Sequence, residues 1–314
     1  MANNKIDIVL PWLNSNDVHW RKQYEDYLIT VKKGDKSISR IRDWDNLKYF
    51  LRSVDKNCKW VNKVVLCVFD ENQIPEWLNV NNSKLKILYH RDYIPESCMP
   101  TFNGLCSGSF LFKSKEIENN IVYCNDDYFF VNETKDTDYF IDNKCVKSLV
   151  KFNNLSWYYN FKSLKNDIWA QLLANTMEYK FKITNNKTLY YQKHLPVSFH
   201  KSDFIEFYKN YEQDLIKEYS KYESKIRQNS NILPLYIVDW IQGDKGDFIQ
   251  DKNYFKYNKV YEITDNYNFT NVFKDILNLK TLCFNDSLKN DIKTFERVKL
   301  ILDGLFSDKS TFEK

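Results

Sequence analysis

The sequence predicts an α/β fold in which a mostly parallel sheet carries a helical C-terminal cap. The first apolar run, residues 5–10 (K-I-D-I-V-L), is short and ends at Pro11, as expected for a strand buried on both faces. Further short apolar runs alternate with stretches of helical spacing up to about residue 123. From Ser156 onward, stretches with helical spacing dominate. Strands that alternate with helices indicate a layered α/β core.

The individual elements follow from the same spacing. After residues 5–10, further strands are expected at residues 63–69, 85–89 and 120–123. Leu47, Phe50, Leu51 and Val54 recur at helical spacing and predict a helix over residues 44–56. Other helices are expected at residues 20–31, 106–116, 164–179, 202–225, 233–242, 270–277 and 289–305.

Composition restricts the class of protein. The chain has 314 residues, 43% of them hydrophobic and 17% aromatic, which is enough for a full core and argues against a disordered or fibrous protein. We treat residues 1–314 as a single catalytic unit, with a soft boundary at residues 134–144 between an α/β part (1–133) and a mostly helical part (145–314). Forty-six basic and 42 acidic residues give a net charge of only +4, which disfavours nucleic acid as a partner.

The polar N-terminus lacks the basic start and long apolar stretch of a signal peptide. No run approaches ~20 apolar residues, so we expect no membrane-spanning helix, while contact with a membrane surface stays open. We therefore expect a cytoplasmic protein. The seven cysteines are scattered, without C-x-x-C or Cys/His zinc spacing, and are expected to be reduced core thiols.

Ligands of parallel sheets bind beyond the carboxyl ends of the strands, so the polar residues there are the first candidates. The segment P-W-L-N-S-N-D (11–17) follows the first strand. Trp12 could stack on a base, and Asn14 and Asp17 could bind ribose or phosphate. The same composition also makes an ordinary turn followed by a helix cap.

Two further segments place carboxylates after apolar runs. Asn125, Asp126 and Asp127 could supply oxygen ligands for Mg²⁺ or Mn²⁺, although Asn and Asp are also typical of a hairpin turn. Asn285 and Asp286 end the apolar segment C-F-N-D (283–286), where they could also belong to the site. The alternative is that either residue caps a helix that follows.

A few histidines and arginines are further candidates for the functional site. His194 in H-L-P is expected on a loop, because Pro196 biases its predecessor toward an extended backbone; it could be an acid, a base or a surface residue. Arg227 is expected at the end of a helix, where its charge would also suit the helix dipole. Arg40, Arg42 and Arg52 surround a predicted helix start that Asp43 or Asp45 could cap, and solvated charges are the alternative for each.

Taken in order, these segments resemble the Stealth family, which includes bacterial capsular polysaccharide phosphotransferases and the catalytic subunit of lysosomal-enzyme N-acetylglucosamine-1-phosphotransferase. The opening I-D-I-V-L-P-W-L-N-S-N-D is similar to the family's I-D-V-V-Y-T-W-V-N-G-S-D. The most specific match comprises R-I-R-D (40–43), L-K-Y-F-L-R-S-V-D-K-N (47–57), K-W-V (59–61), Q-I-P-E-W-L-N (73–79), P-T-F-N (100–103) and N-D-D (125–127). H-L-P (194–196), with Arg227 downstream, and C-F-N-D (283–286) match the two later blocks.

The resemblance implies a Rossmann-like fold that binds a UDP-sugar together with Mg²⁺ or Mn²⁺. Its reaction would move hexose- or N-acetylhexosamine-1-phosphate to a saccharide hydroxyl and release UMP, in capsule or cell-surface polysaccharide synthesis. The implied partners are the UDP-sugar donor, an oligosaccharide or glycan acceptor and a membrane-bound capsule assembly complex. The implied catalytic residues are Asp127, His194 and Arg227. The implied substrate contacts are Trp12, Asn14, Asp17, Arg40, Asp43, Arg52, Asn103 and Asn285, and the implied metal ligands are Asp126 and Asp286.

Two departures from the family pattern matter. Relatives have a glutamate, expected at the sugar, where this chain has Gly108, and histidines where it has Phe110 and Phe112. The first block has Ser15 in place of glycine. A different donor sugar or a weakened enzyme would follow, which keeps open a degenerate, non-catalytic sugar-binding member. The other alternative is a UDP-sugar-dependent glycosyltransferase that releases UDP, since the folds can look alike and N-D-D (125–127) imitates a metal-binding carboxylate pair.

Overall fold

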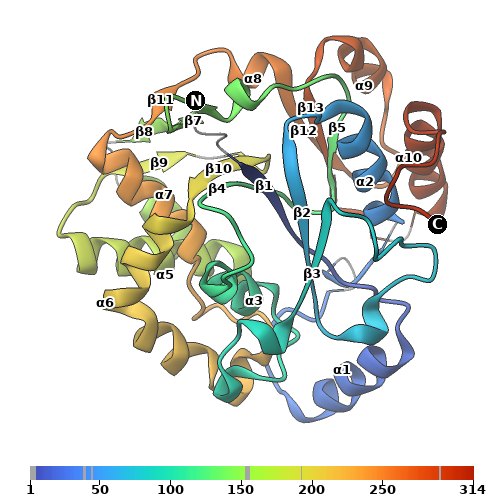
Figure 1. The fold of residues 1–314 in the computed structure, drawn as a ribbon. Helices are drawn as coiled ribbons and strands as arrows, with labels where there is room; N and C mark the ends of the chain where they lie inside the picture. The colour runs from blue at the N-terminus through green and yellow to red at the C-terminus, as the bar shows by residue number, and fades with distance from the viewer. Residues whose placement is uncertain (1–4, 38–39, 44, 153–155, 192, 290) are drawn as a thin grey trace.

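A five-stranded sheet lies at the centre of the computed structural model, which describes residues 5–37, 40–43, 45–152, 156–191, 193–289 and 291–314 (Figure 1). The order is β10-β4-β1-β2-β3. β1, β2, β3 and β4 run parallel, and β10 pairs antiparallel with β4. The bounds are β1 (Ile6–Pro11), β2 (Val61–Val68), β3 (Leu85–Tyr89), β4 (Asn120–Tyr123) and β10 (Val197–His200). The predicted α/β class with a mostly parallel sheet is confirmed.

Both faces of β1 are covered, as its apolar run predicts. Ile8 and Leu10 belong to one hydrophobic cluster and Val9 to another, because successive side chains of a strand point to opposite faces. Asp7 is also buried, where it accepts hydrogen bonds from Asn62 and from the backbone N–H of Glu118. The strand therefore sits in the middle of the core with its polar group satisfied.

The helices lie largely where their spacing predicts them, with shifted ends. The bounds are α1 (Val18–Thr30), α2 (Asn46–Asn57), α3 (Gly104–Phe110), α4 (Ser156–Ser163), α5 (Ile168–Thr184), α6 (Lys201–Tyr219), α7 (Pro234–Lys245), α8 (Tyr254–Tyr257), α9 (Thr270–Asp275) and α10 (Ile292–Leu305). The predicted helices 106–116 and 202–225 are too long, since short 3₁₀ turns follow α3 and α6. Residue 44, the predicted start of α2, lies outside the described residues.

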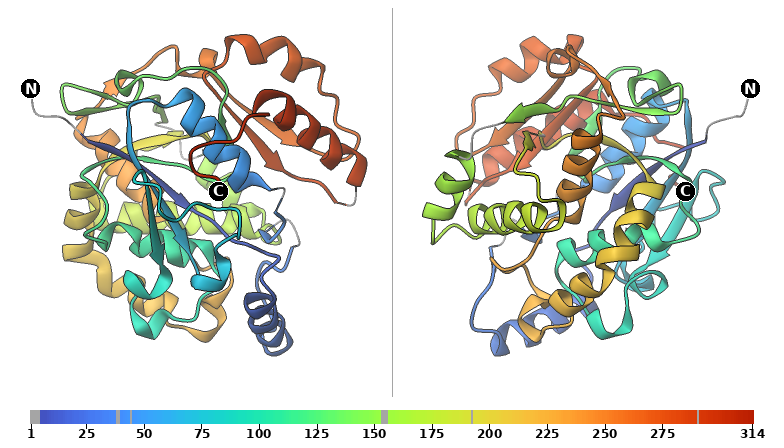
Figure 2. Two further views of the ribbon diagram at one scale, coloured as in Figure 1. Left: turned by 45° about the vertical axis from the view of Figure 1, so that its right-hand side comes forward. Right: turned by 90° about the vertical axis from the view of Figure 1, so that its left-hand side faces the viewer.

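The C-terminal part also contributes strands that the spacing did not predict. β12 (Asn258–Ile263) and β13 (Thr281–Asp286) are parallel, and β13 pairs antiparallel with β5 (Tyr128–Phe130). Smaller sheets join β11 (Ile249–Gln250), β7 (Lys144–Lys147) and β6 (Phe140–Ile141), and β8 (Val150–Phe152) with β9 (Leu189–Tyr191). Figure 2 shows β12, β13 and α10 on one side of the main sheet, with α5, α6 and α7 on another. Residues 145–314 are thus a mixed layer that also completes the main sheet through β10.

Two alternative interpretations of the strand ends are excluded by this topology. β4 and β5 belong to different sheets, so residues 125–127 carry the chain from one sheet to the other and do not form a hairpin turn. Asn285 and Asp286 end β13 and cap no helix, because α10 begins at Ile292 with Asp291 as its N-cap.

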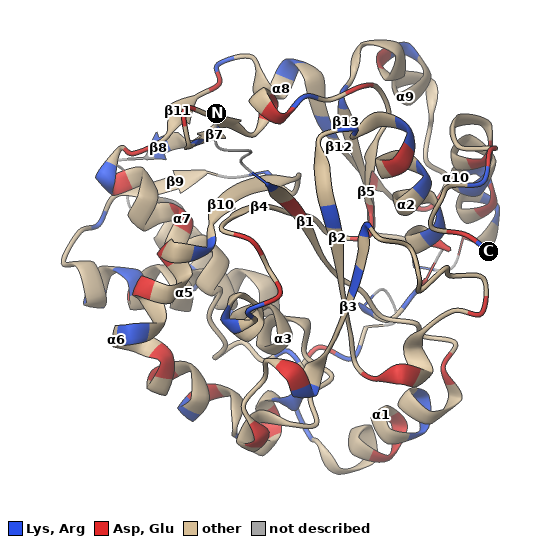
Figure 3. Ribbon diagram, in the orientation of Figure 1, with Lys and Arg blue, Asp and Glu red and all other residues tan. Residues whose placement is uncertain are grey.

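Among the predictions made from composition, the one for the cysteines is confirmed. All seven cysteines are buried and free. Basic and acidic residues are interspersed on helices such as α1 and α6 (Figure 3). Within the described part of the chain, no helix is both long and apolar enough to cross a membrane.

Candidate active site

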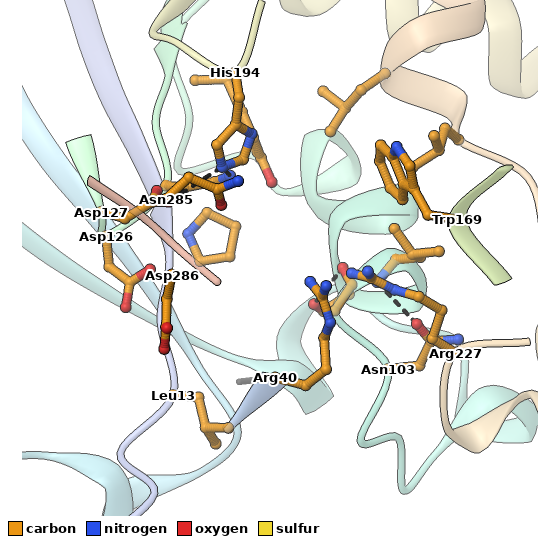
Figure 4. A pocket seen from close by; sticks show the side chains of 18 of the residues that line it. Leu13, Arg40, Asn103, Asp126, Asp127, Trp169, His194, Arg227, Asn285 and Asp286 are labelled. Atoms are coloured by element: carbon orange, nitrogen blue, oxygen red, sulfur yellow. Dashed lines mark hydrogen bonds and ion pairs between the residues drawn. The ribbon is translucent and has the colours of Figure 1, made fainter. Parts of the chain in front are cut away.

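A cavity of about 990 Å³ opens at the carboxyl ends of the central strands. Pro11 ends β1 and Trp12 follows it, Phe69 follows β2, and residues 125–127 follow β4; all of them line the cavity. Figure 4 shows His194, Asp126, Asp127, Asn285 and Asp286 on one wall and Arg40, Asn103, Trp169 and Arg227 on the other. An acidic wall with a histidine therefore faces a basic wall with an indole across one space.

His194 and Asp127 form the polar centre of the first wall. His194 lies on the loop between β9 and β10, as predicted, and its Nε2 is 3.2 Å from Oδ2 of Asp127. Its Nδ1 is 3.1 Å from the hydroxyl of Tyr128, and the two rings meet edge to face. Burial lowers the pKa of His194, but the Asp127 carboxylate outweighs it and leaves that pKa above its ordinary value. The pair is thus suited to accept a proton and hold it on the imidazole.

Cys283 completes this centre from the second sheet. Its thiol donates to Oδ2 of Asp127 at 3.3 Å, because the antiparallel pairing of β13 with β5 sets Cys283 opposite Tyr128. Oδ1 of Asp127 is buried and has no hydrogen-bond partner among the residues that the structure describes. No residue spacing in the sequence predicts a contact between positions 127 and 283, so Cys283 is not recognisable as a site residue from the sequence.

Asp126 and Asp43 crowd negative charge next to the cavity. Burial, followed by the neighbouring Asp127 and Asp43, raises the pKa of Asp126 to about 7. Burial raises the pKa of Asp43 to about 6, and its Oδ1 accepts from the backbone N–H of Asn46 at 3.3 Å at the start of α2. Asp126 lines the cavity, whereas Asp43 is not among the lining residues. In the structure Asp43 thus supports the start of α2, and its role as a substrate contact stays a prediction.

Asp286 and Asn285 also line this wall, and the side chains of both already bond to other residues. One guanidinium nitrogen of Arg42 lies 2.8 Å from both carboxylate oxygens of Asp286. The amide of Asn285 donates to Glu262 at 2.7 Å. Asp286 is thus charge-balanced by Arg42, while Asp126 has no such cation beside it among its strongest neighbours.

Arg227 dominates the opposite wall. It follows the 3₁₀ turn Tyr222–Lys225 and lies on a loop, so the predicted helix end is wrong. Burial lowers the pKa of Arg227 to about 10, and the nearby Arg40 adds to the effect. Its guanidinium carbon lies 5.6 Å from the centroid of the Trp169 ring, and its buried Nε lacks a partner within the described ranges. Arg40 pairs with Asp35 at 3.0 Å. Two cations therefore share one wall without enough negative charge beside them.

Asn103 holds the loop that carries Arg227. Its Oδ1 caps α3 by accepting from the N–H of Leu105, and its amide donates to Ser224 O and to Asn231 Oδ1, each at 2.9 Å. These bonds use both ends of the side chain. Asn103 lines the cavity, but the contacts assign it a positioning role.

Three other predicted contacts lie away from the cavity. Asp17 caps α1 through the N–H of His19 and accepts from Gln73, which also accepts from the N–H of Asn14. Arg52 donates twice to Glu313 at 2.8 Å and once to Phe306 O. In the structure Asn14 and Asp17 shape the loop after β1, and Arg52 ties α2 to the C-terminal segment, while their roles as substrate contacts stay predictions. Trp12 and Arg40 do line the cavity.

Gly108 lies behind the cavity wall. A Cβ atom there would meet only the Tyr123 hydroxyl at 3.7 Å and Leu235 at 3.9 Å, which are ordinary contacts, and both residues line the cavity. Phe110 and Phe112 are buried, and Phe112 stacks on Phe204. The departures from the family pattern therefore replace polar groups with core packing on this side of α3.

An aromatic section of the cavity was missed altogether. Its lining side chains come from α4, α5, β9 and α7, namely Phe161, Trp169, Tyr190, Tyr191 and Tyr236. Trp169 is 40% exposed and packs edge to face on Tyr236. Because four separate elements contribute these rings, no local pattern predicts that they share one surface.

Comparisons with known proteins identify the relatives of the chain. A crystal structure of the galactosyltransferase LgtC with donor and acceptor sugar analogues superposes with a TM-score of 0.42 at 12% identity, covering 97% of this chain and 98% of the other. The capsular polysaccharide phosphotransferase WcwK of Streptococcus pneumoniae is 29% identical over 99% of this chain and 98% of its own length. The capsular polysaccharide phosphotransferase SacB of Neisseria meningitidis serogroup A is 28% identical over 99% of this chain and 57% of its own length. Residues 40–148 match Stealth protein CR2, conserved region 2. Residues 40–148 are thus similar to the Stealth family, and nearly the whole chain is similar to bacterial capsular polysaccharide phosphotransferases.

Proposed function

We propose that the protein transfers a hexose- or N-acetylhexosamine-1-phosphate from a UDP-sugar to a saccharide hydroxyl and releases UMP, in the synthesis of a bacterial surface polysaccharide. The observation that carries the proposal is one cavity in which the His194–Asp127 pair faces Arg227 and Arg40. A proton acceptor on one side and cations on the other are what phosphoryl transfer to a hydroxyl requires. The similarity to capsular polysaccharide phosphotransferases supports the same reaction class.

The cavity offers a place for each part of the substrates. The loop after β1, with Trp12 and Leu13, would take the nucleotide, since this strand end is where such sheets bind their ligands. Arg227 and Arg40 would hold the diphosphate, because guanidinium groups form strong charge-assisted bonds to phosphate, and that of Arg227 is largely desolvated. The aromatic section around Trp169 would take sugar.

The substrates and these side chains account for every bond and proton of the proposed chemical step. The acceptor hydroxyl attacks the β-phosphorus, a new P–O bond forms, and the bond from that phosphorus to the bridging oxygen breaks so that UMP leaves with this oxygen. The hydroxyl proton passes to the His194–Asp127 pair, whose carboxylate stabilises the resulting imidazolium. Arg227 stabilises the charge on the phosphoryl oxygens in the transition state.

A divalent cation such as Mg²⁺ or Mn²⁺ fits one part of the site. Asp126 lines the cavity, and the repulsion from Asp127 and Asp43 that raises its pKa is what a cation would relieve. The amide oxygen of Asn285, which its bond to Glu262 does not use, could add a second oxygen. Asp286 would have to give up Arg42 to contribute. The ion would supply charge neutralisation for the diphosphate.

The proposed setting is cytoplasmic, at the inner face of the membrane, where a UDP-sugar and a growing glycan would meet. A capsule assembly complex would be the partner there. Co-purification with membranes that carry the complex, and its loss in membranes without it, would test this part.

The reaction is tested by incubating the purified chain with UDP-sugars, Mg²⁺ and capsule-type oligosaccharides, and by resolving UMP from UDP chromatographically. Acceptor-dependent UMP is expected. Acceptor-dependent UDP would mean a glycosyltransferase and would overturn the proposal. Binding of UDP-sugar without release of either nucleotide, across the sugar panel, would support a non-catalytic role instead.

A further inference from the structure

We infer that Asp127, His194 and Cys283 form a binding site for a thiophilic divalent cation such as Zn²⁺. One ligand atom from each residue, a carboxylate oxygen, an imidazole nitrogen and Sγ, lies within 4.8 Å of the other two. Oδ2 of Asp127 is 3.2 Å from Nε2 of His194 and 3.3 Å from Sγ of Cys283. Ligand atoms around tetrahedral zinc are separated by about 3.3–3.6 Å, from Zn–N and Zn–O bonds of about 2.0–2.2 Å and Zn–S bonds of about 2.3 Å. The ion would therefore require only small movements.

The surrounding structure fixes the three ligands. The backbone N–H of Phe284 donates to the backbone carbonyl of Asp127 at 3.0 Å. This bond holds the segment that carries the carboxylate against the strand that carries the thiol. The Tyr128 hydroxyl lies 3.1 Å from Nδ1 of His194, so the ring presents Nε2 toward Asp127. A hydrogen bond to the second ring nitrogen is the usual support of a metal-binding histidine.

The donor set selects the class of cation. A thiol and an imidazole favour Zn²⁺ or Co²⁺ over the hard Mg²⁺, so this site differs from the oxygen-rich one proposed at Asp126. Cys283 is fully buried, whereas His194 and Asp127 line the cavity with side chains 40% and 17% exposed. A bound ion would thus have protein behind it and an open coordination position toward the cavity.

Binding of zinc would inhibit the transferase. The ion would occupy Nε2 of His194 and Oδ2 of Asp127, the atoms that the proposed reaction uses for the acceptor proton. The Cys283 thiol would lose its proton to the buffer, since the thiolate is the ligand. The inhibition rests on the proposed function, but the binding does not.

The binding is tested on the full chain by titration with Co²⁺, which reports thiolate ligation through a sulfur-to-cobalt charge-transfer band. We expect a band that saturates at one Co²⁺ per chain and that added Zn²⁺ abolishes. Cys283→Ser should remove it. Cys67→Ser is the matched control, because Cys67 is another buried strand cysteine that lines the cavity outside the cluster, and it should keep the band. His194→Ala should weaken binding at least about tenfold.

Circular dichroism and thermal unfolding establish that each variant is folded. No band in the wild type at millimolar Co²⁺, or an equal band in Cys283→Ser, overturns the site. Release of UMP is then measured at fixed Mg²⁺ with increasing Zn²⁺, and inhibition is expected at the concentration that displaces Co²⁺. If the band forms but no UMP is ever released, the proposed function fails while the site stands. If UMP is released and the band is absent, the site fails while the function stands.

Discussion

Nε2 of His194 lies 3.2 Å from Oδ2 of Asp127 although the two residues are 67 positions apart in the sequence. The antiparallel pairing of β10 with β4 explains the contact. Val197 at the start of β10 pairs with Tyr123 at the end of β4, so the residues just before β10 lie beside those just after β4. The one antiparallel strand of the main sheet thus delivers a histidine to the carboxyl edge of the parallel strands.

Replacing Asp127 by Asn should change the pH dependence of turnover. The carboxylate holds the pKa of His194 above its ordinary value against the effect of burial, so its loss should lower that pKa and move the acidic limb of kcat/KM to lower pH. Maximal turnover should fall about 100-fold or more, because the imidazolium loses its partner. The checks are a pH–rate profile of UMP release and NMR titration of the His194 ring.

Asp136→Asn is the control for this change, since Asp136 is exposed and its side chain accepts from the N–H of the adjacent Thr137. It should leave the profile unaltered. An acidic limb at the same pH in wild type and Asp127→Asn would separate Asp127 from the proton transfer.

Arg227→Gln should greatly reduce activity without loss of stability. Burial and the neighbouring Arg40 disfavour its charged form, so the fold gains little from this guanidinium, while the transition state would lose a charge-assisted contact. We expect kcat to fall about 100- to 1,000-fold and Tm to stay constant or rise. Arg91→Gln, at an exposed arginine paired with Glu71, should change neither quantity. A large fall in Tm would instead make Arg227 a structural residue.

The helices, strands and site residues that could be predicted from the sequence are those that a local residue pattern specifies. The apolar run of β1 and the helical spacing of Leu47, Phe50 and Val54 in α2 specify their own secondary structure. The acidic pair 126–127 is recognisable because it follows β4 directly. His194 is recognisable through its proline-adjacent loop position, and its role came from the resemblance to the family.

What could not be predicted depends on contacts between distant segments. The strands β12 and β13 lie between helical stretches, and nothing in their composition reveals that β13 would pair with β5. The roles of Asn14, Asp17 and Arg52 depend on Gln73 and Glu313, which are far away in the sequence. The same holds for Cys283, whose neighbour Asp127 lies 156 positions upstream.

Arg52→Gln should destabilise the protein and leave substrate affinity unchanged. The side chains of Arg52 and Glu313 are 10% and 3% exposed, and breaking a buried pair leaves a charge without its partner. The free energy of unfolding should fall by about 3–5 kcal/mol. Chemical denaturation measures the loss, and steady-state kinetics below the transition measure KM. A raised donor KM with unaltered stability would restore Arg52 as a substrate contact.

Asp126→Asn should remove the stabilisation of the protein by Mg²⁺. Because the folded pKa of Asp126, about 7, exceeds the unfolded value, its contribution to stability is present below about pH 4 and is lost as pH rises through about 7. A bound cation would offset this loss, and protons compete with it less at pH 8 than at pH 6. We expect Mg²⁺ to raise the wild-type Tm more at pH 8, by several degrees, and Asp126→Asn to show no such rise. Potassium chloride at matched ionic strength is the control, and an equal rise with it would exclude a specific site.

Trp169→Ala should weaken binding of the acceptor saccharide more than it slows the chemical step. The indole is 40% exposed in the aromatic section of the cavity, on the wall opposite His194, where it could stack on a sugar ring. The acceptor KM should rise about 2- to 12-fold, the range that corresponds to 0.5–1.5 kcal/mol for an aromatic contact, while the donor KM stays constant. Trp169→Phe should restore most of the affinity, and Tyr159→Ala, at an exposed aromatic outside the cavity, should have no effect. The guanidinium of Arg227 lies 5.6 Å from the same ring, so a fall in kcat with unaltered KM values would mean that Trp169 acts by positioning Arg227.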